Sequence, residues 1–380
     1  MNRYITVLLG ASLLLTGCIP GFEKQEEVIQ DPLQEEAERA IVPRYKISDE
    51  YYQTILPFKP GQTRGQVVPR LGSRYDVDEF ETGLMRLSLA QFPSNTYLYQ
   101  DGQTIPRNTV RAWLQRKEGE GSLGLNLPLV EGADDQETNE NSPIILAHIL
   151  EQNYLVRKND GNVELGGVTI GLALNTVHSY EMVLESGVPV ARDYPIPDGL
   201  IESEGKRMAE TIAARVRDEV GSGIPIMIAL YKQSPNTSIV PGTFIARATV
   251  AENSATVSRW ETVNESYQLF PSSATMNDYR DDAVRFREFK ADIDDYFPNH
   301  TGVVGTGHYI EEDLQRLTIR INMDFHGKAE LIGFTQYVTG LVLEHFPAHV
   351  NLQLSIMSIN GPEALIIRDA GAEKPFVHIY

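Results

Sequence analysis

Cysteine is nearly absent from the sequence: among 380 residues the only one is Cys18. A single thiol cannot form a disulfide within the chain, so packing must stabilise the folded body. Basic residues are also few, with 33 lysines and arginines against 52 acidic residues and a formal net charge of −19. Such an acidic surface repels the phosphates of nucleic acids, and the sequence therefore predicts no nucleic-acid partner.

Long apolar runs are missing after the N-terminus. No further stretch of about twenty apolar residues follows, so we expect no membrane-spanning helix in the body of the protein. Hydrophobic residues nevertheless make up 42% of the chain, which is typical of a folded protein with a sizeable core. The length permits two domains or one large one.

The common catalytic and metal-binding motifs are also missing. A GxSxG elbow is absent, and the glycines of residues 302–307 do not follow the dinucleotide-binding order GxGxxG. His345 and His349 have the i, i+4 spacing of a zinc-binding helix, but Pro347 between them ends a helix. The sequence therefore predicts no metal site, no catalytic residues and no enzymatic activity.

The N-terminus has the pattern of a lipoprotein signal. Arg3 precedes an apolar stretch, residues 5–15, that is too short to span a bilayer comfortably. A small-residue pair directly before Cys18 has the form of a bacterial lipobox. We therefore expect cleavage before Cys18 and covalent attachment of diacylglycerol to its thiol. The signal peptidase would recognise the residues that precede the cut, Leu15, Thr16 and Gly17. The alternative is an ordinary secretory signal in which the cysteine stands by chance.

Cleavage at this point leaves residues 18–380 on the extracytoplasmic face of the cell membrane. The expected partners are then the membrane, through the lipid anchor, and the lipoprotein-processing peptidases. Residues 18–47 are acidic and poor in large apolar side chains, which predicts a flexible tether extended by charge repulsion. A surface helix with a sparse apolar face, formed by Val28, Leu33 and Ala37, is the alternative for residues 23–38.

Residues 48–265 read as an N-terminal α+β region. A helix capped by Asp76 would place Phe80, Leu84 and Leu87 on one face. The nearly continuous apolar run of residues 224–231 is typical of a strand covered on both faces. Further strands are expected at 51–58, 154–156, 163–165 and 168–174, further helices at 106–117 and 202–220, and an exposed loop at 131–141.

Residues 266–380 read as a second α+β region. Residues 317–325 are expected to form a strand with one buried face, because apolar and polar side chains alternate from Leu317 to Met323. Helices are expected at 278–297 and 328–346, and further strands at 303–310, 350–359, 364–368 and 376–380. The predicted fold class is α+β, with mixed or antiparallel sheets, packed helices and two subdomains.

One loop is a candidate ligand-binding site. It directly follows the apolar strand 224–231, and loops that a rigid strand positions often carry function. Its hydrogen-bonding side chains are Lys232, Gln233, Ser234 and Asn236. The alternative is a crossover turn that is fixed by Pro235 and the asparagine and has no functional role.

Three segments, together with the lipobox, resemble the CamS family of lipoproteins, the sex-pheromone precursors of Gram-positive bacteria. The segments are Tyr51 to Gly65, Ile228 to Ala246 and Tyr296 to Tyr309. The resemblance implies a lipid-anchored protein whose cleaved signal can be trimmed to a short apolar peptide pheromone. Here that remnant would lie within Gly10 to Gly17. Every lipoprotein leaves such a remnant, so its existence does not by itself indicate signalling. The family name describes the cleaved signal and leaves the role of the folded body to be found.

The leading hypothesis is a membrane-anchored extracytoplasmic lipoprotein whose non-enzymatic body binds an unknown protein or small ligand. Its only expected cofactor is the covalent diacylglycerol at Cys18. The alternative is a cell-envelope enzyme that acts on wall polymer through an unrecognised site. A transport-type substrate-binding lipoprotein is a third possibility, but its repeated βαβ units are mostly missing from this chain.

Overall fold

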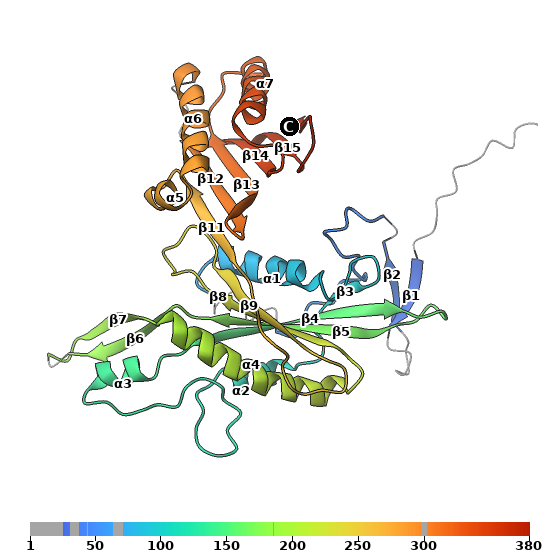
Figure 1. Ribbon diagram of the computed structural model, residues 1–380, viewed down its shortest axis with the longest axis vertical. Helices are drawn as coiled ribbons and strands as arrows, with labels where there is room; N and C mark the ends of the chain where they lie inside the picture. The colour runs from blue at the N-terminus through green and yellow to red at the C-terminus, as the bar shows by residue number, and fades with distance from the viewer. Residues whose placement is uncertain (1–25, 31–37, 44, 64–70, 185, 298–301) are drawn as a thin grey trace, which may run out of the picture.

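The computed structural model describes residues 26–30, 38–43, 45–63, 71–184, 186–297 and 302–380. The predicted signal peptide and Cys18 lie outside these residues. The described part forms two lobes, each built on one six-stranded sheet, and the chain passes from the first sheet to the second between Thr262 and Glu265 (Figure 1). The fold is α+β with mixed sheets, which confirms the predicted class.

The N-terminal lobe contains a mixed sheet with the strand order β10-β9-β8-β5-β4-β3. Its central strands β5 and β8 are parallel, whereas the other neighbours are antiparallel. The strands are β3 (Leu98–Asp101), β4 (Leu146–Arg157), β5 (Val163–Leu174), β8 (Ile226–Lys232), β9 (Thr243–Val250) and β10 (Glu261–Thr262). Strands β4 and β5 form the hairpin expected around residues 159–161, and β5 continues through the expected strand 168–174.

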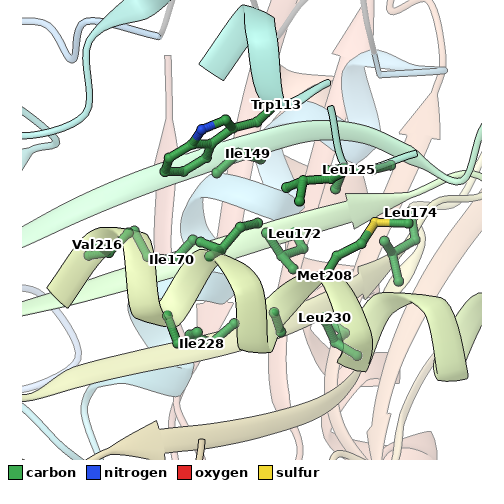
Figure 2. Packing of buried hydrophobic residues seen from close by; sticks show 14 of the residues in the cluster. Trp113, Leu125, Ile149, Ile170, Leu172, Leu174, Met208, Val216, Ile228 and Leu230 are labelled. Carbon is green, nitrogen blue, oxygen red and sulfur yellow. The ribbon is translucent and has the colours of Figure 1, made fainter. Parts of the chain in front are cut away.

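Helices cover both faces of this sheet. Helix α1 (Arg74–Ser88) lies on one face, whereas α2 (Arg107–Trp113) and α4 (Asp198–Val220) lie on the other. Side chains of β8 alternate between the two cores: Ile228 and Leu230 pack with α4, and Met227, Ala229 and Tyr231 pack with α1. Figure 2 shows the α4 side of this packing. The continuous apolar sequence of β8 is therefore explained by burial on both faces, as predicted.

The cap of α1 differs from the prediction. Ser73, and not Asp76, is the N-cap: the Ser73 hydroxyl accepts a hydrogen bond from the Asp76 N–H at 3.1 Å. Asp76 stands in the first turn, where a carboxylate is favoured by the exposed N–H groups of a helix. The apolar positions Phe80, Leu84 and Leu87 are buried, as expected from their spacing.

The C-terminal lobe contains a sheet with the strand order β11-β12-β13-β14-β15-β16. Helix α7 connects β13 to its parallel neighbour β14, and all other neighbours are antiparallel. The strands are β11 (Glu265–Phe270), β12 (Gly302–Ile310), β13 (Asp313–Asn322), β14 (Asn351–Ser358), β15 (Gly361–Arg368) and β16 (Phe376–Ile379).

Helices α6 (Arg280–Tyr296) and α7 (Lys328–His345) contribute apolar side chains to the core of this lobe. Within β13 the buried residues Leu317, Ile319 and Ile321 alternate with exposed polar ones. This confirms the prediction of a strand with one buried face. Helix α6 confirms the expected helix 278–297 to within two residues, and the short helix α5 (Ser273–Asp278) precedes it and was not predicted.

Two small antiparallel sheets complete the described structure. Strands β6 (Val177–Val183) and β7 (Pro189–Pro195) form an arm that projects from the N-terminal lobe (Figure 1). Strands β1 (Glu26–Gln30) and β2 (Glu38–Val42) pair within the segment predicted as a tether. The helix considered as the alternative for this segment is therefore wrong at residues 26–30.

Two local expectations were wrong. Residues 51–58 form no regular strand and make only isolated bridges, Ile41 with Leu56 and Thr54 with Tyr99; Pro57 has no N–H to donate to a ladder. The expected loop 131–141 contains helix α3 (Asp135–Asn141), whose N-cap Asp134 accepts from the Glu137 N–H at 2.8 Å. No residue of α3 is buried, so hydrophobic periodicity could not have revealed it.

Candidate functional site

A cavity of about 480 Å³ lies at the carboxyl ends of β5 and β8. We call it the β5–β8 cavity. It is lined by residues 233–237 after β8, residues 175–179 after β5, Leu71 and Gly72 before α1, Ile144 before β4, and Asp193 of β7. The carboxyl ends of parallel strands meet at one edge of a sheet, a frequent place for ligand sites in sheets that contain parallel strands.

Parallel pairing of β5 with β8 brings two amide side chains together. Asn175 directly follows β5, and Gln233 directly follows β8. The Gln233 side-chain amide donates to Asn175 Oδ1 at 3.1 Å, and its Oε1 accepts from the Gly72 N–H at 2.9 Å. Asn175 Nδ2 in turn donates to the Ile144 carbonyl at 3.0 Å. These bonds link β8, β5, α1 and β4 around the cavity.

A buried carboxylate fixes the loop that begins at residue 233. Asp76 is fully buried, and its Oδ1 accepts from the Tyr231 hydroxyl at 2.8 Å, the Gly242 N–H at 2.8 Å and the Ser234 N–H at 3.2 Å. Burial, together with the charge of Asp76, raises the pKa of Tyr231 well above its ordinary value. The tyrosine therefore stays protonated and donates to Asp76, which holds both ends of the loop against α1.

The opposite wall consists of the arm. The Ser179 hydroxyl donates to Asp193 Oδ1 at 2.6 Å across the two strands. His178 accepts from the Ile144 N–H through Nδ1 at 3.4 Å, and its Nε2 lies 3.4 Å from Asn139 Oδ1. Burial lowers the pKa of His178, and the charge of Arg116 lowers it further, so the ring is neutral at pH 7.

This geometry does not form a nucleophile and base pair among the described residues. Both ring nitrogens of His178 contact the partners just named, and the Ser179 hydroxyl contacts a carboxylate. The described part of the chain also contains no group of three or more His, Cys, Asp or Glu side chains that could hold a metal ion. The cavity can hold and orient a ligand through hydroxyl and amide groups.

The predicted loop residues take different places. Gln233, Ser234 and Asn236 line the cavity, whereas the Lys232 ammonium forms an ion pair with Asp198 at 2.8 Å, at the start of α4. Leu15, Thr16, Gly17 and Cys18 lie outside the described residues. Asn175 and Asp193 also line the cavity, although no sequence motif marks either residue. Asn175 follows a predicted strand, but only the parallel pairing of β5 with β8 places it beside Gln233.

Comparison with known proteins identifies several relatives. The family model described as CamS sex pheromone cAM373 precursor matches residues 58–374. A solved sex pheromone precursor from Lactobacillus salivarius subsp. salivarius UCC118 is similar, with 26% identity and a TM-score of 0.81 over 90% of this chain and 99% of that chain. The C-terminal domain of the sex pheromone staph-cAM373 precursor from Staphylococcus aureus shares 32% identity, with a TM-score of 0.69 over 82% of this chain and 98% of that chain.

No curated protein sequence matches the chain. Among the described residues, no helix has the length and apolar character needed to cross a membrane.

Proposed function

Because this chain belongs to the CamS family of sex pheromone precursors, we propose that it is a lipoprotein of the extracytoplasmic membrane face whose folded body binds a ligand or partner. The anchor would be diacylglycerol on Cys18, added after signal peptidase recognises Leu15, Thr16 and Gly17. Two acyl chains suffice to hold a protein on a membrane, since each buried methylene contributes about 0.8 kcal/mol. The match to the family begins at residue 58, so the N-terminal sequence itself supports the anchor.

The observation that carries the binding role is the preorganised rim of the β5–β8 cavity. Gln233 is 4% exposed and Asp76 is fully buried, and their hydrogen bonds fix the backbone that presents Ser234 and Asn236. A loop held in one conformation before binding loses little conformational entropy when a ligand arrives. Because this fixed loop also exposes Asn236 at the rim of a cavity, we favour a binding loop over a purely structural turn.

We propose that the body is not an enzyme. The polar groups around the cavity contact one another in pairs that stabilise the loop and the arm, and none of the described contacts activates a nucleophile. The comparisons lend no support to the alternative of an enzyme acting on wall polymer.

The pheromone role belongs to the cleaved signal. The remnant Gly10 to Gly17 is uncharged and apolar, which suits a peptide that has to leave one membrane and enter another cell. A synthetic peptide of this sequence is expected to cause aggregation of plasmid-bearing enterococci, whereas a scrambled peptide of the same composition is not. Equal responses to the two peptides would remove this role.

Metabolic labelling tests the anchor. Cells given a clickable palmitate analogue should label the wild-type chain and not Cys18→Ala, because the thiol is the only acceptor for diacylglycerol. The conservative change Ile19→Val leaves the cysteine in place and should label like the wild type. Undiminished labelling of Cys18→Ala would overturn the anchor proposal.

A further inference from the structure

We propose that the β5–β8 cavity binds an uncharged, polyhydroxylated ligand of one or two sugar rings. This inference rests on the binding role proposed for the body and adds the chemical class of the ligand. The volume of about 480 Å³ falls within the range of roughly 300–1,000 Å³ found for small-molecule sites.

The charges of the lining disfavour an anion. Among the described residues, none that lines the cavity is a lysine or arginine, and the neighbouring Lys232 is held in an ion pair with Asp198. The charged side chain of the lining is the Asp193 carboxylate, and the chain as a whole carries −19. A phosphate or carboxylate entering the cavity would meet the like charge of Asp193, and the described lining offers it no lysine or arginine to contact.

The side chains at the rim match hydroxyl groups. Thr176, Ser234 and Thr237 present hydroxyls, each of which can donate and accept, and Asn236 presents both an amide donor and a carbonyl acceptor. The Asp193 carboxylate has a second oxygen beside the one bound to Ser179, and a carboxylate accepts readily from two neighbouring hydroxyls. Vicinal hydroxyls of a sugar supply this alternation of donors and acceptors.

Apolar side chains of the lining complete the match. Leu71, Ile144, Val177 and Pro235 also line the cavity, and they can contact the C–H face of a sugar ring. A mixture of apolar surface with a few fixed polar groups is typical of small-molecule sites.

The backbone around the cavity disfavours an extended peptide. Peptides bound in extended form use free backbone N–H and C=O groups of the host. Here the backbone N–H groups of Gly72, Asn175, Gln233 and Ser234 already donate to Gln233, Ile145, Leu174 and Asp76, respectively. These four N–H groups are therefore not open to a strand-like peptide, and the side chains of the rim can instead contact a ligand with hydroxyls on its periphery.

Binding to the purified full chain tests the ligand class. We suggest saturation-transfer NMR and calorimetry in a zwitterionic detergent without a sugar headgroup, with cellobiose, chitobiose, triglycine and pyrophosphate as probes. At least one disaccharide should bind. Asn236→Ala should lower the affinity for it about tenfold, which corresponds to the loss of one hydrogen bond to the ligand. Asn95→Ala, which alters another exposed asparagine in a turn, should leave the affinity unchanged.

The outcomes separate the ligand class from the binding role. The ligand class is wrong, and the binding role stands, if triglycine or pyrophosphate binds while the disaccharides do not. In that case Asn236→Ala must also weaken the binding of triglycine or pyrophosphate. If Asn236→Ala and Asn95→Ala weaken disaccharide binding equally, the site is not this cavity. If none of the four probes binds, both the ligand class and the small-ligand role of the cavity are overturned.

Discussion

Asp76 is the residue that connects the helix α1 to the loop of the candidate site. Its carboxylate is fully buried and accepts from Tyr231, Ser234 and Gly242, and its Oδ2 accepts from the Ser73 hydroxyl at 2.8 Å. Hydrogen bonds to a charged group contribute about 1.5–3 kcal/mol each, more than those between neutral groups. One side chain thus determines the position of the helix cap and of the cavity rim.

Replacing Asp76 with asparagine should destabilise the protein by about 2–4 kcal/mol. The amide keeps the size of the side chain but has one acceptor oxygen in place of two. Its NH₂ group would then face a group that donates a hydrogen bond to the Asp76 carboxylate. Urea unfolding followed by far-UV circular dichroism measures the change. Asp78→Asn on the same helix is the control, because the Asp78 side chain is 70% exposed and its substitution should change stability by less than about 0.5 kcal/mol. Equal effects of the two substitutions would contradict the role of Asp76.

At the scale of secondary-structure elements, helix α1 packs directly on β5. A methyl group at Gly171 would lie 2.8 Å from a ring carbon of Phe80 and 2.9 Å from a methyl carbon of Leu84. Both are core side chains of α1 and both are fully buried. The close approach of helix and strand therefore depends on the missing side chain at this position.

We expect Gly171→Ala to lower the free energy of unfolding by about 1–3 kcal/mol, because the added carbon forces α1 away from the sheet. Gly340→Ala in α7 is a matched substitution with the opposite expected sign. Apart from its chain neighbours and the backbone of its own helix, no atom of the described residues lies within 4 Å of the position that its methyl group would take, so better helix propensity should stabilise the protein by about 0.5–1 kcal/mol. Urea midpoints of the two variants against the wild type give the comparison. An unchanged free energy of unfolding in Gly171→Ala would show that α1 is not closely packed on β5.

Across the whole molecule, an ion cluster joins the two lobes. Arg86 of α1 contacts Glu79 at 2.9 Å and Glu265 of β11 at 2.7 Å, and the imidazole of His308 lies 3.6 Å from Glu265. Tyr267 stacks on His308 with ring centroids 4.6 Å apart. Burial raises the pKa of Glu265, but its contacts with His308 and Arg86 outweigh burial and lower the pKa below its ordinary value of 4.5.

The lowered pKa predicts acid sensitivity of the junction between the lobes. The ionised Glu265 carboxylate contributes stability at pH values above 4.5, and this contribution is lost as the pH falls through the lower pKa of the folded state. Glu265→Gln should therefore be less stable than the wild type at pH 7 and should lose less stability between about pH 5 and pH 3. Urea unfolding at several pH values provides the measurement.

The control for this experiment is Glu261→Gln. Glu261 pairs with Arg247 at 2.9 Å, but its side chain is 65% exposed, so its removal should leave the pH dependence close to that of the wild type. An unchanged pH profile in Glu265→Gln would mean that the buried cluster does not contribute to acid sensitivity.

Local sequence patterns predicted the longer helices α1, α2, α4, α6 and α7 and the strands β4, β5, β8 and β12 to β16, but they did not predict β3, β6, β7 or β9 to β11. The alternation in β13 and the continuous apolar run of β8 were sufficient to predict these two strands. Burial of one face requires apolar side chains at every second position, and burial of both faces requires them at every position. Helix α3 escaped prediction because it buries no side chain, and the strands β1 and β2 because their segment is acidic and polar. Such elements are stabilised by caps and pairing and have no hydrophobic period.

By itself, the sequence determined the fold class, the lack of disulfides and the acidic character of the protein, and it predicts a lipid anchor at Cys18. Only the tertiary structure decided which residues surround the cavity. Gly72, Asn175 and Gln233 meet because β5 and β8 are parallel neighbours and α1 packs over them. Strand pairing and helix docking depend on contacts between distant parts of the chain, and no local pattern around any one of these residues specifies them.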